Sequence, residues 1–304
     1  MTKRLNTVKL LVLSLILVAA LTSCAVDTTY PGTMNVVEAS KVVEEYMTNS
    51  SVVLVDARGQ EAYDKGHAKG AVMLSPTELV ADGPVPMTLA SKEQIETVLS
   101  AKGISDSDTI YIYDNNSGVS AGRIWWTLRV YGHENVMIVN GGESALVNAD
   151  IELSTEPANR PETTYTAKAP KTEMIATYEE VLGYSENPAE DVVILDVRSI
   201  AEYEAGFIPG AILYPHTKNV YADGTFMSSR DLGLFYKEEG IEKEDLIIIY
   251  CKSSFRATQT AALLEEAGYE NLKVYDGAWL EWESKTDVIT VPSNDAPVGA
   301  SDGS

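Results

Sequence analysis

The sequence predicts an α/β protein with two tandem domains, each a mainly parallel central sheet flanked by helices. Residues 52–58 (VVLVDAR) and 192–198 (VVILDVR) repeat one another 140 positions apart, which indicates a duplicated domain. Each copy has short apolar runs without alternation, typical of strands buried on both faces. Helical stretches separate these runs, and strands that alternate with helices form parallel sheets.

The elements follow the same order in both copies. Strands are expected at 52–55, 109–113, 136–139, 192–195, 246–250 and 272–275. Helices are expected at 91–102 and 258–267, where Gly103 and Gly268 occupy the position favoured for helix C-terminal glycines. Residues 154–172 are rich in proline and poor in apolar side chains, as linkers are. We predict domains at 34–153 and 173–286, a linker at 154–172 and a disordered tail at 287–304.

Composition limits the possible partners. The 304 residues include 45 acidic and 23 basic side chains, giving a formal net charge of −22. Such a surface repels a phosphate backbone, so we predict no nucleic-acid partner. His67, His133 and His216 are scattered and form no ligand cluster, so we predict no metal and no cofactor.

The N-terminus predicts export. Residues 1–23 combine basic residues with an apolar stretch too short for a typical membrane-spanning helix, as secretory signal peptides do. Residues 21–24 (LTSC) resemble the bacterial lipobox, and that resemblance implies a lipid on Cys24. The protein would then be anchored in the bacterial cell envelope, outside the cytoplasm, through a tether at 24–33. The alternative is an ordinary signal peptide or membrane anchor with an incidental cysteine.

Cys251 is the candidate nucleophile. It follows the expected strand 246–250 and leads through a polar loop into a helix, so main-chain N–H groups and a helix N-terminus should surround it. Lys252 and Arg256 add positive charge, and all of these effects favour thiolate over thiol. The alternative is a cysteine that only fills the core. Against it, the first copy has Asp114 at this position. The expected substrate-binding loop residues are Lys252, Ser253, Ser254, Phe255 and Arg256.

A second motif, D-x-R, occurs in both copies. Asp56 and Arg58 form it in the first, and Asp196 and Arg198 in the second. Because one of these copies lacks the cysteine, we expect a structural ion pair at the strand end that supports the site rather than performing chemistry.

Four further segments carry a resemblance to a known protein family. They are 121–129 (AGRIWWTLR), 140–142 (NGG), 206–211 (GFIPGA) and 275–282 (YDGAWLEW). With them, residues 36–285 resemble the tandem rhodanese-type sulfurtransferases, the thiosulfate and 3-mercaptopyruvate sulfurtransferase family. The resemblance implies a non-catalytic first domain and a catalytic second domain.

The family chemistry would proceed through Cys251. Its thiolate would take sulfur from a small anionic donor such as thiosulfate, carry it as a persulfide, and pass it to a thiophilic acceptor such as cyanide or a thiol. Arg256 would steer the donor, Lys252 would assist electrostatically, and Ser253 and Ser254 could supply hydroxyl hydrogen bonds.

The loop departs from the family pattern. Four residues separate Cys251 from Arg256, whereas related phosphatases have five, so phosphatase activity is disfavoured. Ser254 replaces a common glycine, so the loop is expected to be distorted. Glu202 stands where mercaptopyruvate-type members carry arginine, which favours thiosulfate or a persulfide as donor. Two alternatives stay open: a persulfide carrier or redox sensor without turnover, and a purely structural pair of domains.

Overall fold

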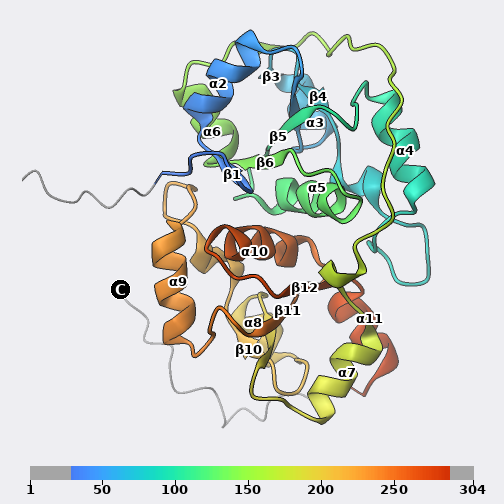
Figure 1. The fold of residues 1–304 in the computed structure, drawn as a ribbon, viewed down its shortest axis with the longest axis vertical. Coiled ribbons are helices and arrows are strands. Elements are labelled where there is room, and N and C mark those ends of the chain that lie inside the picture. The colour runs from blue at the N-terminus through green and yellow to red at the C-terminus, as the bar shows by residue number, and fades with distance from the viewer. Residues whose placement is uncertain (1–28, 288–304) are drawn as a thin grey trace, which may run out of the picture.

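The computed structural model describes residues 29–287, which form two α/β domains (Figure 1). Each domain has a five-stranded parallel sheet, in the order β1-β6-β5-β2-β4 in the first and β10-β9-β11-β12-β8 in the second. The predicted two-domain α/β fold is therefore confirmed. Cys24, the signal peptide and nearly all of the predicted tail lie outside the described residues.

The two sheets correspond strand by strand. The first contains β1 (Val36–Val37), β2 (Val52–Asp56), β4 (Val72–Met73), β5 (Thr109–Tyr113) and β6 (Val136–Val139). The second contains β8 (Ile175–Ala176), β9 (Val192–Asp196), β10 (Ile212–Leu213), β11 (Leu246–Tyr250) and β12 (Leu272–Tyr275). A small antiparallel pair, β3 (His67–Ala68) with β7 (Leu153–Ser154), completes the first domain. The central strands β2, β5, β9 and β11 are almost wholly buried, which explains their continuous apolar runs.

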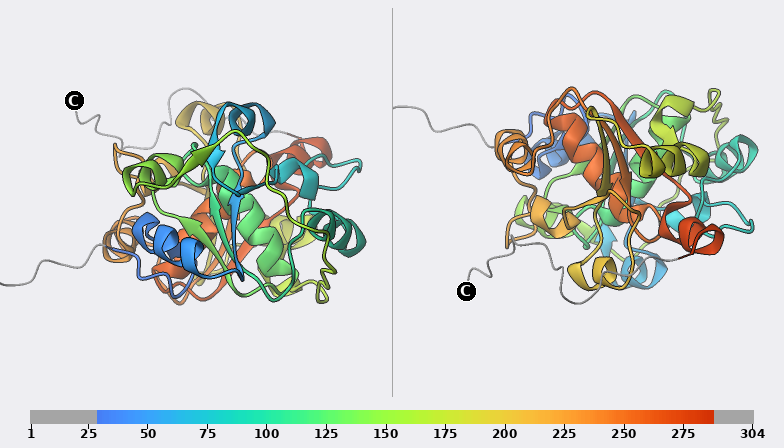
Figure 2. Two further views of the ribbon diagram at one scale, coloured as in Figure 1. Left: turned by 90° about the horizontal axis from the view of Figure 1, so that it is seen from above. Right: turned by 90° about the horizontal axis from the view of Figure 1, so that it is seen from below.

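Helices lie on both sides of the sheets, as the views from above and below show (Figure 2). Those of the first domain are α2 (Ala39–Thr48), α3 (Gln60–Lys65), η1 (Pro76–Leu79), α4 (Lys92–Ala101), α5 (Val119–Val130) and α6 (Gly142–Asn148). Those that follow are η2 (Thr172–Met174), α7 (Tyr178–Glu186), α8 (Ile200–Glu204), η3 (His216–Asn219), α9 (Ser229–Glu238), α10 (Phe255–Glu266) and α11 (Ala278–Lys285).

The domains meet along α5 and α10, which lie against each other between the two sheets (Figure 1). Gly122 makes this approach possible. A Cβ added to it would lie 2.8 Å from both the backbone nitrogen and the Cα of Gln259 in α10. Only a residue without a side chain fits at such a distance, so the glycine fixes the separation of the two helices.

The connection between the domains packs against the first of them. Residues 155–171 contain no helix or strand. The N–H of Thr163 donates to the carbonyl of Ser100 (3.1 Å), and the N–H of Lys168 donates to that of Tyr131 (2.9 Å). Tyr165 is buried, and its hydroxyl lies 3.0 Å from Nδ1 of His133. These contacts tie the connection to the first domain.

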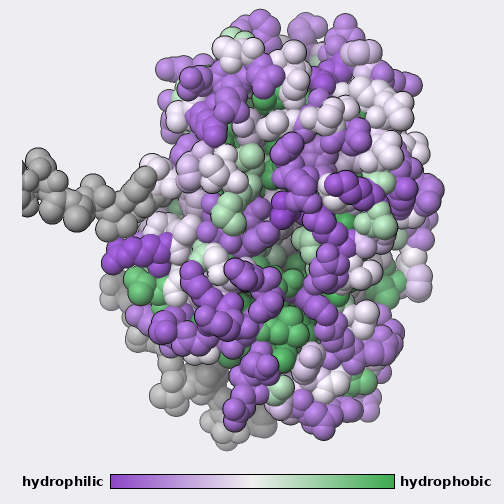
Figure 3. All heavy atoms as spheres, in the orientation of Figure 1, coloured by the Kyte–Doolittle hydropathy of each residue, from purple (hydrophilic) through white to green (hydrophobic). Residues whose placement is uncertain are grey.

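The outer surface is polar. Hydrophilic residues cover most of the face shown in Figure 3. Among residues 29–287, no helix combines the length and the apolar character needed to cross a bilayer. Within the same range, no three His, Cys, Asp or Glu side chains are grouped as a metal site requires.

One predicted boundary was wrong in a way that matters for the site. The helix expected at 258–267 begins earlier, at Phe255. Ser254 caps it in the left-handed conformation, with φ +66°. Phe255 and Arg256 therefore belong to the first helical turn rather than to the loop, and the loop after Cys251 is short.

Candidate active site

Cys251 lies at the carboxyl end of β11, the middle strand of the second sheet. Its side chain is buried, with 1% of the residue exposed. The carbonyl of Cys251 accepts a hydrogen bond from the N–H of Trp279 (3.0 Å), and that of Lys252 accepts one from Leu280 (3.2 Å). The start of α11 thus supports the loop from one side. Ligands of open α/β sheets bind at this edge, so the predicted position of the thiol is suited to chemistry.

The equivalent loop of the first domain shows how such a loop treats an anion. One carboxylate oxygen of Asp114, Oδ1, accepts from the N–H groups of Asn116 (3.3 Å) and Gly118 (2.9 Å). The other, Oδ2, accepts from the N–H of Ala121 (3.0 Å). Burial raises the pKa of Asp114, while the N–H groups of Ala121, Gly118 and Asn116 oppose that rise. Converging main-chain N–H groups therefore bind the oxygens of an acidic side chain at the position that corresponds to Cys251.

The loop of the second domain leaves its donors unused. In residues 29–287, no protein atom accepts a hydrogen bond from the main-chain N–H groups of residues 252–256. These groups belong to the loop and to the N-terminus of a twelve-residue helix, whose dipole also favours negative charge.

Ser254 shapes this loop. The serine takes the left-handed φ of +66° that glycine usually supplies, so the expected distortion does not occur. Its hydroxyl accepts from Nη1 of Arg123 (2.6 Å), a residue of the first domain. The Ser254 oxygen lies 2.6 Å from the carbonyl of Ser253 and 3.1 Å from Oδ1 of Asp276, both of which can accept its proton. Polar contacts therefore hold a conformation that serine adopts only at a cost.

Arg256 is held by a carboxylate beside the thiol. Its Nη1 and Nη2 donate to the two oxygens of Glu202 at 2.7 and 2.8 Å. This hydrogen bonding raises the pKa of Arg256, and the nearby Cys251 adds to the rise. The same contact lowers the pKa of Glu202 to about 2. The cation that should steer an anionic donor is thus largely neutralised by a bidentate ion pair.

His216 lies in the electrostatic field of this pair. Burial, followed by the charge of Arg256, lowers the pKa of His216, so its imidazole is neutral at pH 7. Its buried Nδ1 has no hydrogen-bond partner in the part of the chain that the structure describes. No local sequence pattern predicts this placement, since the three histidines are scattered along the chain.

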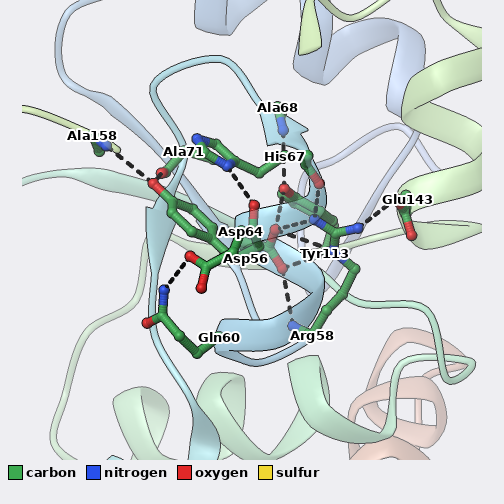
Figure 4. A network of polar contacts seen from close by, with 12 residues as sticks. Asp56, Arg58, Gln60, Asp64, His67, Ala68, Ala71, Tyr113, Glu143 and Ala158 are labelled. Atoms are coloured by element: carbon green, nitrogen blue, oxygen red, sulfur yellow. Dashed lines mark hydrogen bonds and ion pairs between the residues drawn. The ribbon is translucent and has the colours of Figure 1, made fainter. Parts of the chain in front are cut away.

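The two D-x-R motifs form the expected ion pairs. In the first domain, Nε of Arg58 donates to Oδ1 of Asp56 at 2.9 Å, and the hydroxyl of Tyr113 donates to Oδ2 at 2.6 Å (Figure 4). Arg58 also pairs with Glu143. All of these contacts lie in the domain without the cysteine, which favours a structural role.

The second domain repeats this arrangement with one change. Nη2 of Arg198 donates to Oδ2 of Asp196 at 2.6 Å, and the hydroxyl of Tyr250 donates to the same oxygen at 2.5 Å. In place of a second carboxylate, the Arg198 guanidinium lies 4.4 Å from the ring centroid of Trp279. Because Tyr250 immediately precedes Cys251, the pair fixes the strand end from which the loop starts.

The structure brings together most of the predicted residues. Arg256 lies beside the Cys251 side chain, Ser254 is buried three positions after it, Ser253 and Phe255 are half-buried, and Lys252 is exposed on the surface. Sequence reasoning missed the roles of Arg123 and Asp276. Both stand in segments that carry the family resemblance, but their contact joins residues 153 positions apart. No local pattern predicts such a contact.

Comparison with known proteins agrees with this geometry. The sequence model of the rhodanese-like domain family matches residues 39–149 and again residues 177–285. The chain therefore belongs to the rhodanese-like family, as a tandem of two such domains. A protein of Mycolicibacterium smegmatis described as "putative thiosulfate sulfurtransferase" is 34% identical over 240 residues, 73% of this chain and 85% of that protein. One from Haloferax volcanii with the same description is 34% identical over 242 residues, 73% and 82% of the two chains.

Solved structures show the same architecture. The 3-mercaptopyruvate sulfotransferase SseA of Escherichia coli superposes with a TM-score of 0.74 at 27% identity, covering 81% of this chain and 99% of that one. An anaerobic ergothioneine biosynthesis enzyme of Chlorobium limicola also gives 0.74, at 23% identity, over 83% and 70% of the chains. This second likeness concerns the fold alone. The first, together with the curated relatives, places the chain among the sulfurtransferases.

Proposed function

We propose that the protein is a thiosulfate sulfurtransferase that carries sulfur on Cys251. The observation that supports this is the contrast between the two loops: in the first domain the N–H groups bind the Asp114 carboxylate, whereas those of residues 252–256 have no protein acceptor. A persulfide anion on Cys251 would supply that acceptor. The relatives described as thiosulfate sulfurtransferases support the same reaction.

The reaction has two steps, transfer of sulfur to Cys251 and transfer from Cys251 to an acceptor. The Cys251 thiolate attacks the outer sulfur of thiosulfate, the S–S bond of the donor breaks, and sulfite leaves with the bonding electron pair. Cyanide or a thiolate then attacks the outer sulfur of the persulfide, and the Cys251 thiolate returns. Because the intermediate is covalent, the kinetics should be ping-pong.

Purified protein lacking residues 1–24 should form thiocyanate from thiosulfate and cyanide, and Cys251→Ser should form none. Activity that survives Cys251→Ser would refute the proposal. Wild-type protein that gains about 32 Da, one sulfur atom, without turnover would instead be a persulfide carrier.

Glu202 bears on the choice of donor. Because its carboxylate already binds both outer nitrogens of Arg256, no free pair of N–H groups remains there to bind the carboxylate of 3-mercaptopyruvate in two places, and thiosulfate has no carboxylate that needs this contact. We therefore expect a higher kcat/KM for thiosulfate than for 3-mercaptopyruvate. A preference for the 2-oxo acid would contradict this assignment.

We also propose that Cys24 anchors the protein by a lipid to a membrane of the bacterial cell envelope, outside the cytoplasm, on the strength of residues 21–24. The two cysteines provide matched controls. Cys24→Ser should abolish incorporation of labelled palmitate and release an active protein from the membrane fraction. Cys251→Ser should stay lipidated and membrane-bound without activity. Palmitate labelling that persists in Cys24→Ser would exclude this anchor.

A further inference from the structure

A buried arginine of the first domain reaches the loop of the second. Arg123 lies in α5 and has 0% of its surface exposed. Its Nη1 donates to Oγ of Ser254 (2.6 Å) and to Oδ1 of Asp276 (2.7 Å), and its Nη2 donates to the carbonyl of Met87 (3.0 Å). Ser254 closes the short loop that begins at Cys251. The domain without a cysteine thus contributes a cation next to the catalytic loop.

This charge is paired with a carboxylate in the domain interface, and only Nε of Arg123 is left without a hydrogen-bond partner among residues 29–287. Asp276, 9% exposed, pairs with Arg123 through one oxygen and accepts from the N–H of Leu89 (2.6 Å) through the other. The guanidinium carbon also lies 4.9 Å from the ring centroid of Trp126 and 5.3 Å from that of Phe255. Pairing and aromatic faces make burial of the cation tolerable, and they fix its direction.

The first domain shows why such support is needed. There the cap of the corresponding helix is Gly118, with φ +80°, and glycine takes this conformation without strain. The second domain has Ser254, which does not. In this conformation its hydroxyl contacts Arg123 and Asp276, and these contacts offset a strain that glycine would not have.

The interface is reciprocal. Gly132 and Gly268, matched in the repeat, are 136 positions apart, and the same offset relates Arg123 to Gln259. Nε2 of Gln259, in α10, donates to the carbonyl of Ser117 in the loop of the first domain (3.0 Å). Each interface helix therefore sends one side chain into the loop of the other domain, but only the second loop receives a charged one.

From these contacts we propose that Arg123 is a positioning residue for sulfur transfer. It holds Ser254 at positive φ, and Ser254 keeps the N–H groups of residues 252–256 arranged around the sulfur. The inference rests on the proposed function of Cys251 and adds that the first domain is a required part of the site. Arg123 does not touch the sulfur and acts only through Ser254.

Arg123→Gln removes the charge and should lower kcat between about tenfold and about a hundredfold, the range expected for a misplaced reacting group. Arg129→Gln is the matched control. Arg129 lies on the same helix and also bridges the domains, to Glu265 at 2.9 Å, but not through the Cys251 loop. Its substitution should leave kcat near the wild-type value. An equal loss in both variants would refute the proposal, because any interface arginine would then suffice.

Ser254 variants separate positioning from general stability. Ser254→Gly, added to Arg123→Gln, should recover much of the lost kcat, because glycine needs no support at positive φ. If the double variant folds but stays as slow as Arg123→Gln, the proposal is wrong. Should Arg123→Gln not fold, single variants decide: Ser254→Gly must exceed Ser254→Ala in kcat, and the reverse order overturns the inference.

Amide hydrogen exchange tests the positioning role of Arg123 without any measurement of sulfur transfer, so it separates this inference from the proposed function. Amide hydrogen exchange at Thr258, whose N–H donates to the carbonyl of Ser254 (2.9 Å), should be faster in Arg123→Gln than in Arg129→Gln. Equal exchange in the two variants would reject the positioning role, whether or not the wild-type protein transfers sulfur. Wild-type protein that transfers none would reject the function of Cys251, while the exchange experiment would still test Arg123.

Discussion

Substituting alanine for Gly122 should loosen the contact between the two domains. The added Cβ would lie 2.8 Å from the backbone nitrogen and from the Cα of Gln259, and 3.3 Å from its Cβ. Backbone atoms of a helix cannot rotate out of the way, so α5 and α10 must move apart. Overpacking of this kind costs about 1–3 kcal/mol.

A matched variant removes the contribution of helix propensity. Gly183 lies in α7, and a Cβ added there would have no heavy atom within 4 Å. Both substitutions gain about 1 kcal/mol of helix propensity, so the difference between them isolates the clash. At about 2–4 °C for each kcal/mol, Gly122→Ala should melt about 2–12 °C below Gly183→Ala.

Thermal unfolding followed by circular dichroism measures this difference. Because Arg123 follows Gly122 directly, its 2.6 Å contact to Ser254 should lengthen as well, and thiocyanate formation should slow in the same variant. Equal melting temperatures for the two alanine variants would refute the reasoning, because the helices would then have room for a side chain.

Three further predictions concern buried and half-buried charges. Glu202→Ala leaves Arg256 without its carboxylate partner, so the KM for thiosulfate should fall; an unchanged KM would show that the ion pair does not compete with the donor. The folded-state pKa of Glu202, about 2, lies below its usual 4.5, so the stability that the ionised carboxylate adds to the fold is complete above pH 4.5 and is lost as pH falls toward 2. In acid-unfolding curves, the stability advantage of wild type over Glu202→Gln should therefore shrink across that range. A constant difference between the two proteins would contradict this reasoning. Asp196→Ala leaves Arg198 buried and unpaired, which should cost about 3–5 kcal/mol in urea unfolding; a loss under about 1 kcal/mol would argue against a buried ion pair.

The repeat and the apolar runs were enough to predict the fold. All six expected strands are present, and the ends of β2 and β9 differ from the prediction only by Asp56 and Asp196. Burial on both faces leaves a direct mark on local composition, which explains this success. The position of Cys251 at a strand end followed from the same signal.

The internal contacts of the site could not be predicted from local sequence. Helix α10 begins at Phe255 because Ser254 adopts a left-handed conformation, which sequence-based reasoning expects only of glycine. The Arg123 contacts to Ser254 and Asp276 span 131 and 153 positions and arise only when the domains dock. Glu202 is visible in the sequence as a departure from the family pattern, but its bidentate pairing with Arg256 requires the approach of two elements 54 positions apart.

The Asp114 loop has a consequence for stoichiometry. Its N–H groups are permanently occupied by a side chain of the same molecule, so the first domain acts as a filled copy of an anion site. Sulfite released in the second domain could not bind to the N–H groups of the first-domain loop, because Asp114 already accepts their hydrogen bonds. A protein with two copies of one unit should therefore load one sulfur atom, and titration with a small anion should saturate at one equivalent per chain.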